Sequence, residues 1–194
     1  MNIDEIIKVV SETPSDINEH ILTLKKYAEK CDHITELGVR APVSTWAFVA
    51  AKPKVLRSYD IKHPDEFMSN NSVANLSLKD VEDMCSTLNI DFEFRLADVL
   101  TIEIDQTDLL FIDTQHNFYQ ISQELGLHAS KANKYIVFHD VITWGTRGEL
   151  YGHPNLVIPG ILPAIKHFLE NNANWSIVEV FENNNGLLII ERKD

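Results

Sequence analysis

Short apolar segments of strand length alternate along this sequence with longer segments in which the apolar residues follow helical spacing. Such alternation is typical of a mostly parallel β-sheet with helices on both of its faces. The segment 108–113 is apolar almost without interruption, as expected for a strand buried on both faces. The predicted strands are 33–39, 55–61, 92–96, 108–113, 135–138, 175–182 and 187–191.

The predicted helices cover 18–30, the stretch from Ser44 to just before Pro53, 78–88, 118–128 and 160–171. Ser44 is a residue type that commonly caps a helix N-terminus. The sequence Asn-Asn-Asn-Gly at 183–186 favours a tight turn, so the last two strands are expected to close the sheet as an antiparallel hairpin. We therefore expect an α/β fold in a single domain, 1–194. An N-terminal helix (18–30) precedes a doubly wound, Rossmann-like core (33–194), whose sheet is mostly parallel with a C-terminal antiparallel hairpin strand.

Composition and charge narrow the functional classes. The 194 residues suffice to bury a core without disulfides. Seventeen basic and 29 acidic residues give a formal charge of −12, a sign that repels nucleic acid and anionic membrane surfaces. Cys31 and Cys85 show no metal-binding or disulfide pattern. The acidic residues 1–12 do not resemble a signal peptide, and no stretch has the roughly 18 apolar residues of a membrane span. These features predict a cytoplasmic protein that binds neither nucleic acid nor membranes.

Acidic and imidazole side chains follow nearly every one of the predicted parallel strands. In an open parallel sheet, ligands bind at the carboxyl ends of the strands, near the point where the strand order reverses. Carboxylates gathered there cost free energy, because they repel one another and lose hydration. A functional site is the simplest reason for keeping them. These residues are Glu36, Asp60, Asp98, Asp113, His116, His139 and Asp140.

The turn after the first predicted strand, Gly38 to Ser44, predicts a bound nucleoside. Its glycine lets the backbone approach a ligand, and the helix that follows presents free amides to an anion. The dinucleotide fingerprint GxGxxG is absent from the turn. Asp60 follows Gly38 at about the 20-residue spacing of an acid that accepts hydrogen bonds from ribose hydroxyls. This pattern favours a nucleoside without a pyrophosphate.

Five segments together resemble the class I S-adenosylmethionine (SAM)-dependent methyltransferases. They are ITELGVR (34–40), VSTW (43–46), SYD (58–60), LLFIDTQH (109–116) and IVFHD (136–140). Within that family the likeness is greatest to small bacterial O-methyltransferases and cephalosporin-hydroxylase-type proteins. Each motif alone is weakly specific, but their order and spacing are specific together, and the resemblance covers nearly the whole chain. It implies SAM as cofactor and methyl transfer as the reaction.

The resemblance also implies which residues bind the cofactor. Glu36 and Gly38 border its methionine end, Asp60 holds the ribose, and Asp98 lies beside the adenine. The full set of implied cofactor-binding residues is Glu36, Gly38, Ser44, Asp60, Ala97, Asp98 and Asp113. The family usually has glycines where this chain has Ala41-Pro42, and a proline offers no backbone N–H.

The implied catalytic residues are Asp113, near the methyl donor, and His116, facing the acceptor. Methyl transfer to an alcohol needs alignment and removal of a proton, and an imidazole has an ordinary pKa near neutrality. In metal-assisted relatives, acids after the fourth and fifth strands bind a divalent cation, which makes Asp113 and Asp140 candidate ligands for Mg²⁺. The long predicted loop 143–159 can close over the acceptor.

Structural interpretations stand beside these functional ones. Asp113 and Asp140 can cap the turns after their strands, and His116 can begin a helix. His139, inside an apolar strand end, is interpreted as a structural residue. The favoured function is O-methylation of a hydroxyl on a small molecule such as a sugar or a natural product. A non-catalytic nucleoside-binding module is the alternative, and a nicotinamide-dependent oxidoreductase is least favoured. A homo-oligomer and a monomer are both left open.

Overall fold

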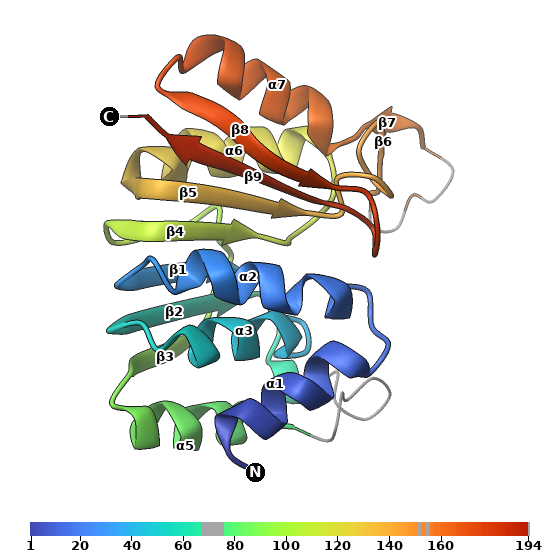
Figure 1. Ribbon diagram of the computed structural model, residues 1–194. Coiled ribbons are helices and arrows are strands. Elements are labelled where there is room, and N and C mark those ends of the chain that lie inside the picture. Colours follow the sequence, from blue (N-terminus) through green and yellow to red (C-terminus); the bar gives the residue numbers. More distant parts are fainter. Residues whose placement is uncertain (67–75, 151–152, 154–155, 194) are drawn as a thin grey trace.

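A seven-stranded sheet lies at the centre of the computed structural model, which describes residues 1–66, 76–150, 153 and 156–193 (Figure 1). In spatial order its strands are β3 (Asp91–Leu96), β2 (Val55–Asp60), β1 (His33–Leu37), β4 (Thr107–Ile112), β5 (Ala132–His139), β9 (Leu187–Arg192) and β8 (Trp175–Phe181). The first five are parallel, and β9 is antiparallel to both β5 and β8. The predicted mostly parallel sheet with a closing antiparallel hairpin is confirmed.

The strand order reverses between β1 and β4. From β1 the chain passes outward through β2 to β3 and then returns to pair β4 with the free side of β1. The carboxyl ends of the five parallel strands meet at one edge of the sheet, on the right in Figure 1. The turn 183–186 between β8 and β9 lies at the same edge. This is the edge at which sheets of this kind bind their ligands.

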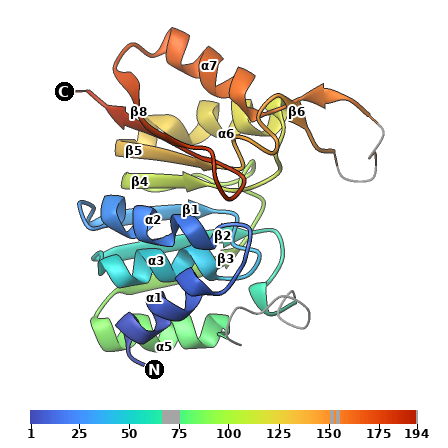
Figure 2. The same ribbon diagram turned by 45° about the vertical axis from the view of Figure 1, so that its right-hand side comes forward.

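Helices cover both faces of the sheet (Figure 2). On one face lie α1 (Ile3–Glu12), α2 (Ile21–Ala28), α3 (Val43–Ala51) and α5 (Leu78–Leu88), and on the other α6 (Phe118–His128) and α7 (Ile161–Asn171). Single 3-10 turns are η1 (Asn18–His20), η2 (Pro64–Glu66) and η4 (Ala129–Lys131).

Burial on both faces of the sheet explains why residues 109–112 of strand β4 are all apolar. Leu109 and Phe111 belong to the core beneath α2 and α3, whereas Leu110 and Ile112 belong to the core beneath α6 and α7. Neighbouring side chains of a strand point to opposite faces, so a strand covered on both sides needs apolar residues at every position. The connection 97–106 contains no helix, as the sequence predicts.

Most predicted elements are found within a few residues of their expected ends, and those at 78–88 and 118–128 agree fully. The prediction of Ser44 as an N-cap is wrong. The N-cap of α3 is Pro42, and the Ser44 hydroxyl donates a hydrogen bond to Glu36 instead, at 2.7 Å. A buried carboxylate needs donors, and Ser44 lies close enough to supply one.

Helix α1 is not among the elements predicted from the sequence. The Asn2 side chain accepts a hydrogen bond from the Glu5 amide, and the Glu5 side chain accepts one from the Asn2 amide. This reciprocal capping box is a pattern readable in the sequence. The buried side chains of Ile6, Ile7 and Val10 hold α1 against α3.

The loop predicted at 143–159 contains a short two-stranded pairing, β6 (Arg147–Gly148) with β7 (Ile158–Pro159). Tyr151, Gly152 and Pro154, which belong to the predicted loop, lie outside the described residues. Over the part of the chain that the structure describes, no helix is both long and apolar enough to cross a lipid bilayer.

Candidate functional site at the carboxyl edge of the sheet

Gly38 joins the ends of β1 and β4. Its amide donates to the Tyr59 carbonyl at 2.9 Å, and the Asp113 amide donates to the Leu37 carbonyl at 2.8 Å, which continues the sheet past the strand ends. Gly38 has φ +87°, and a Cβ placed on it would lie 2.0 Å from the carbonyl oxygen of Asp113. Only glycine allows this approach without strain. The residues that follow the two central strands are thus held side by side.

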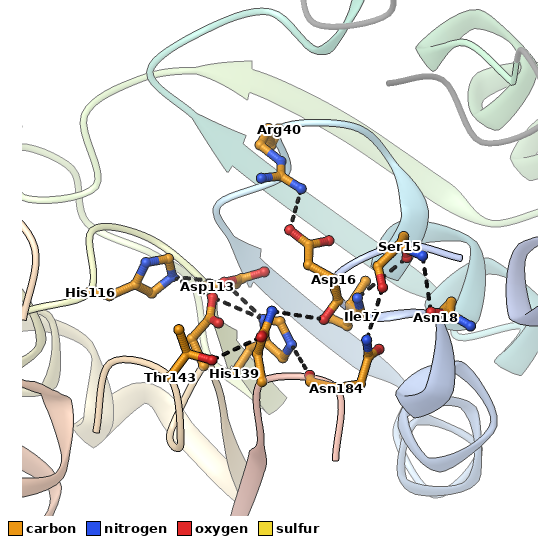
Figure 3. Close-up of polar contacts among 12 residues, drawn as sticks. Ser15, Asp16, Ile17, Asn18, Arg40, Asp113, His116, His139, Thr143 and Asn184 are labelled. Carbon is orange, nitrogen blue, oxygen red and sulfur yellow. Dashed lines mark hydrogen bonds and ion pairs between the residues drawn. The ribbon is translucent and has the colours of Figure 1, made fainter. Parts of the chain in front are cut away.

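Two histidines and three carboxylates meet beside this junction, and Figure 3 shows the rings of His116 and His139 directed toward Asp113. His116 Nε2 lies 3.2 Å from Asp113 Oδ1 and 3.0 Å from Asp140 Oδ2. His139 Nδ1 lies 3.3 Å from each of the same two oxygen atoms. On the other side of the His116 ring, Nδ1 lies 3.0 Å from Glu149 Oε1.

Mutual ion pairing between the imidazoles and the carboxylates sets the protonation states in this cluster. Burial lowers the pKa of the His116 imidazole, but hydrogen bonds to Asp113, Asp140 and Glu149 outweigh burial and raise the pKa to about 12. Burial also lowers the pKa of His139, but Asp113 and Asp140 raise it to about 10. For Asp113, burial raises the pKa, and the two imidazoles together hold it well below its ordinary range. At neutral pH both rings are therefore protonated against ionised carboxylates.

The backbone around Asp140 is shaped for this arrangement. Asp140 has φ +62°, a left-handed conformation that few residues other than glycine adopt. Its carbonyl accepts a hydrogen bond from the Trp144 amide at 3.0 Å. The Trp144 ring lies nearly parallel to the His116 ring, at an interplanar angle of 4° and a centroid distance of 6.3 Å. Trp144 therefore forms a wall of the site beside His116.

His139, interpreted from the sequence as structural, is brought into the cluster. Its side chain is 1% exposed, and its Nε2 lies 3.3 Å from the carbonyl oxygen of Asn184 in the hairpin turn. Asp113, His139 and Asp140 offer ligand atoms that all lie within 4.8 Å of one another, a spacing that can hold a metal ion. The predicted pair Asp113 and Asp140 is thus brought together and joined by an imidazole.

Two groups of this site are not predicted from the sequence. Glu149 lies in the loop after β5 and belongs to no motif, although its amide donates to the His116 carbonyl at 3.0 Å. Asn184 contributes only a backbone carbonyl, which no sequence pattern marks.

Asp60 stabilises the turn that follows β1. Its Oδ2 accepts hydrogen bonds from the amides of Val39 and Arg40, both at 2.8 Å, and its Oδ1 accepts one from the Lys62 amide at 2.9 Å. Arg40 has φ +50° and forms an ion pair with Asp16 of the N-terminal segment (Figure 3). A carboxylate oxygen accepts two hydrogen bonds, so with respect to the described residues Oδ1 of Asp60 keeps one acceptor position for a ligand.

Asp98 and Ala97, predicted beside the adenine, follow β3 at the same edge. Asp98 is exposed, and its Oδ1 accepts a hydrogen bond from the Leu100 amide at 2.9 Å. Ala97 is half-buried against the core beneath α6. Within the described parts of the chain, neither residue is hydrogen-bonded to the imidazole and carboxylate cluster.

Glu36 is buried completely at the end of β1. It accepts hydrogen bonds from the hydroxyls of Ser44 at 2.7 Å, Ser58 at 2.6 Å and Thr45 at 3.0 Å. Burial raises its pKa to about 7, although the three hydroxyl donors oppose this change. The carboxyl group thereby ties β1 to β2 and to the first turn of α3.

We expect Glu36 to make the protein less stable as the pH rises from about 4.5 to about 7, the ordinary and folded-state pKa values of this group. In this window the folded state holds a proton that the unfolded state has lost, so the free energy of unfolding falls by up to about 1.4 kcal/mol per pH unit. Glu36→Gln removes this contribution. Urea unfolding of both proteins at pH 5, 6, 7 and 8 measures it, and parallel stability curves would contradict the prediction.

No protein-family model matches the sequence, and no curated protein matches it either. Solved structures do match. An O-methyltransferase from Bacillus cereus in complex with SAH (S-adenosylhomocysteine) is 14% identical, with 98% of this chain and 90% of that chain covered and a TM-score of 0.59. An O-methyltransferase of tomaymycin synthesis from Streptomyces achromogenes, in complex with SAM, is 13% identical, with 99% and 89% covered and a TM-score of 0.59. Magnesium protoporphyrin IX methyltransferase from Synechocystis, with bound SAH, is 12% identical, with 98% and 93% covered and a TM-score of 0.59.

The chain has the class I methyltransferase fold. The resemblance seen in the sequence motifs is thereby confirmed at the level of the fold. In this methyltransferase fold the cluster of Asp113, His116, His139 and Asp140 follows the central strands β4 and β5, next to the turn that follows β1.

Proposed function

We propose that this protein transfers a methyl group from SAM to a hydroxyl of a small molecule, such as a sugar or a natural product. The observation that carries the proposal is the group of Asp113, His116 and Asp140 at the switch point of a methyltransferase fold. Several structures with this fold were solved with SAM or SAH bound.

The turn after β1 favours a nucleoside over a dinucleotide. The amides of Val39 and Arg40 are bonded to a side-chain carboxylate, Pro42 has no N–H, and the Val43 amide donates to the Ala41 carbonyl at 2.7 Å. The turn thus has few free amides for a pyrophosphate, which dinucleotide-binding turns cradle with theirs. A ligand with a ribose and no pyrophosphate, such as SAM, matches the acceptor position on Asp60 Oδ1.

For methyl transfer the protein must align the acceptor hydroxyl with the methyl group of SAM and remove the hydroxyl proton. The hydroxyl oxygen attacks the methyl carbon in line, the carbon–sulfur bond breaks with its electrons left on sulfur, and the hydroxyl proton passes to a base. The ring of His116 lies beside that of Trp144, which borders the cluster. We assign to His116 the role of the base that accepts the hydroxyl proton. Three carboxylates favour its protonated form, so it accepts a proton only when another positive charge offsets Asp113 and Asp140.

A divalent cation suits those two carboxylates. Asp113 and Asp140, with His139 between them, would hold it, and a cation there would lower the pKa of a bound hydroxyl and orient the acceptor. Mg²⁺ is the ion expected from the sequence. The donor set fits a cation, because the three ligand atoms converge within 4.8 Å.

Calorimetry with SAM, SAH and NAD tests the cofactor assignment. We expect both sulfur nucleosides to bind and NAD not to bind. The release of SAH is then followed with a panel of hydroxylated sugars and phenols as acceptors. Failure of SAM and SAH to bind at millimolar concentration would refute the proposal. Binding without SAH release from any acceptor would favour the alternative, a non-catalytic nucleoside-binding module.

Asp60→Ala is expected to weaken SAH binding by about 1–3 kcal/mol, because the ribose loses a charged acceptor. Asp108→Ala is a matched control: Asp108 Oδ2 also accepts hydrogen bonds from two backbone amides, those of Asp32 and His33, at the opposite edge of the sheet. The control variant loses comparable backbone contacts but no ribose contact. Titration calorimetry compares the dissociation constants, and equal affinities in the two variants would rule out the ribose role.

A further inference from the structure

The ring of His139 is oriented by two different kinds of partner. Nε2 lies 3.3 Å from the carbonyl oxygen of Asn184, and a carbonyl only accepts hydrogen bonds, so Nε2 carries a hydrogen. Nδ1 faces Asp113 Oδ1 and Asp140 Oδ2. The ring of His20 packs edge-on against His139 at a centroid distance of 5.8 Å. Packing and hydrogen bonding thus keep Nδ1 aimed at the carboxylates.

This is the arrangement of a metal-binding histidine. Histidine ligands donate their second ring N–H to a carbonyl or a carboxylate, which fixes the tautomer and directs the free nitrogen at the ion. Here the Asn184 carbonyl is the acceptor for the second ring N–H of His139. This carbonyl belongs to a turn that is fixed by the left-handed residues Asn184, Asn185 and Gly186. The nitrogen left for an ion is Nδ1.

The spacing of the three donor atoms matches a first-row metal. Bonds of about 2.0–2.2 Å at angles of about 90–110° place neighbouring ligand atoms about 2.8–3.6 Å apart. The distances from His139 Nδ1 to Asp113 Oδ1 and to Asp140 Oδ2 are both 3.3 Å, and all three atoms lie within 4.8 Å of one another. An ion that replaces the Nδ1 proton therefore needs only small side-chain movements.

A nitrogen ligand changes which ions the site prefers. Mg²⁺ binds through oxygen atoms and gives up its water reluctantly, whereas imidazole suits later first-row metals such as Fe²⁺, Co²⁺ and Zn²⁺. We propose that Asp113, His139 and Asp140 form a site that binds a first-row transition-metal dication in preference to Mg²⁺. This inference rests on the cation part of the proposed function and replaces the Mg²⁺ expected from the sequence.

The test titrates the full-length, metal-free protein with CoCl₂ and with MgCl₂, without SAM, by calorimetry and visible absorption. We expect one Co²⁺ per chain, bound at least about 100-fold more tightly than Mg²⁺. His139→Asn offers an amide oxygen in place of the ring nitrogen, and the preference for Co²⁺ is expected to shrink at least about 10-fold. His128→Gln is the control: His128 is equally buried and donates to the Val99 carbonyl, and among the described residues no carboxylate is hydrogen-bonded to it, so the variant keeps the full preference.

Equal affinity of the wild type for the two ions would overturn the proposal, as would an unchanged preference in His139→Asn. Should that variant fail to fold, proton NMR of the wild-type Co²⁺ complex decides. Ligation through Nδ1 leaves the Nε2 proton in place, so one strongly shifted, exchangeable imidazole resonance is expected, and its absence counts against the site. SAH binding measured with a chelator present shows separately whether the cofactor part of the proposed function holds.

Discussion

Replacing His116 with alanine is expected to lower the rate of methyl transfer by about 10²–10⁴-fold, the usual contribution of a positioned acid or base. Among the described residues, His116 pairs with Asp113, Asp140 and Glu149 and with none of the groups bonded to Asp60, so the affinity for SAH is expected to change less than about threefold. Single-turnover rates with an acceptor from the screen, together with SAH calorimetry, measure the two effects.

His167→Ala serves as the control for His116→Ala, since it removes an exposed histidine of α7. The control is expected to match the wild type in both measurements. Glu149→Gln keeps an oxygen near His116 Nδ1 but removes its charge, and it is expected to give an intermediate rate. A His116→Ala protein that transfers methyl groups at the wild-type rate would disprove the base role, and normal SAH affinity would show that the variant is folded.

Gly38→Ala is expected to reduce the free energy of unfolding by about 3 kcal/mol or more and to abolish SAH binding. The added Cβ would lie 2.0 Å from the carbonyl oxygen of Asp113 and 2.6 Å from its carbonyl carbon, so the backbones after β1 and β4 must separate. The left-handed φ of +87° adds strain of its own. Urea unfolding and calorimetry measure the two losses.

Gly126→Ala is the matched control for this glycine. Gly126 lies within α6, and a Cβ there meets nothing within 4 Å. Alanine is the better helix former, so this variant is expected to gain about 0.5–1 kcal/mol of stability. If Gly38→Ala proved as stable as Gly126→Ala, the close approach of the backbones after β1 and β4 would not be what requires glycine at position 38.

The sheet can be predicted because each strand shows in its own residues which of its faces are buried. Strand β4 needs apolar side chains at successive positions, and the carboxyl ends of parallel strands must share one edge, so the order of residues alone places Asp113 and Asp140 near each other. Helix α1 is missed although the sequence signals it twice: Asn2 and Glu5 form a capping box, and the apolar residues of Ile3–Glu12 follow helical spacing.

The features of the site that could not be predicted depend on contacts between segments that are distant in the sequence. A lone histidine in an apolar strand end is read as structural, since nothing nearby in the chain tells that His139 meets a carbonyl from residue 184. Asp60 has the spacing of a ribose ligand, but its bonds to the Val39 and Arg40 amides depend on the path of the turn. Glu149 reaches His116 only because β6 pairs with β7 and draws the loop back.

The hairpin turn 183–186 has a consequence for biosynthesis. The carbonyl that orients His139 belongs to a residue made after every side chain of the centre, and β9, which follows it, must still insert between β5 and β8. A nascent chain that already carries both aspartates and both imidazoles therefore has all the side chains of the centre without the contact that aims one of its rings. Insertion of β9 into the sheet, rather than translation of the last side chain of the centre, is the step that completes this site.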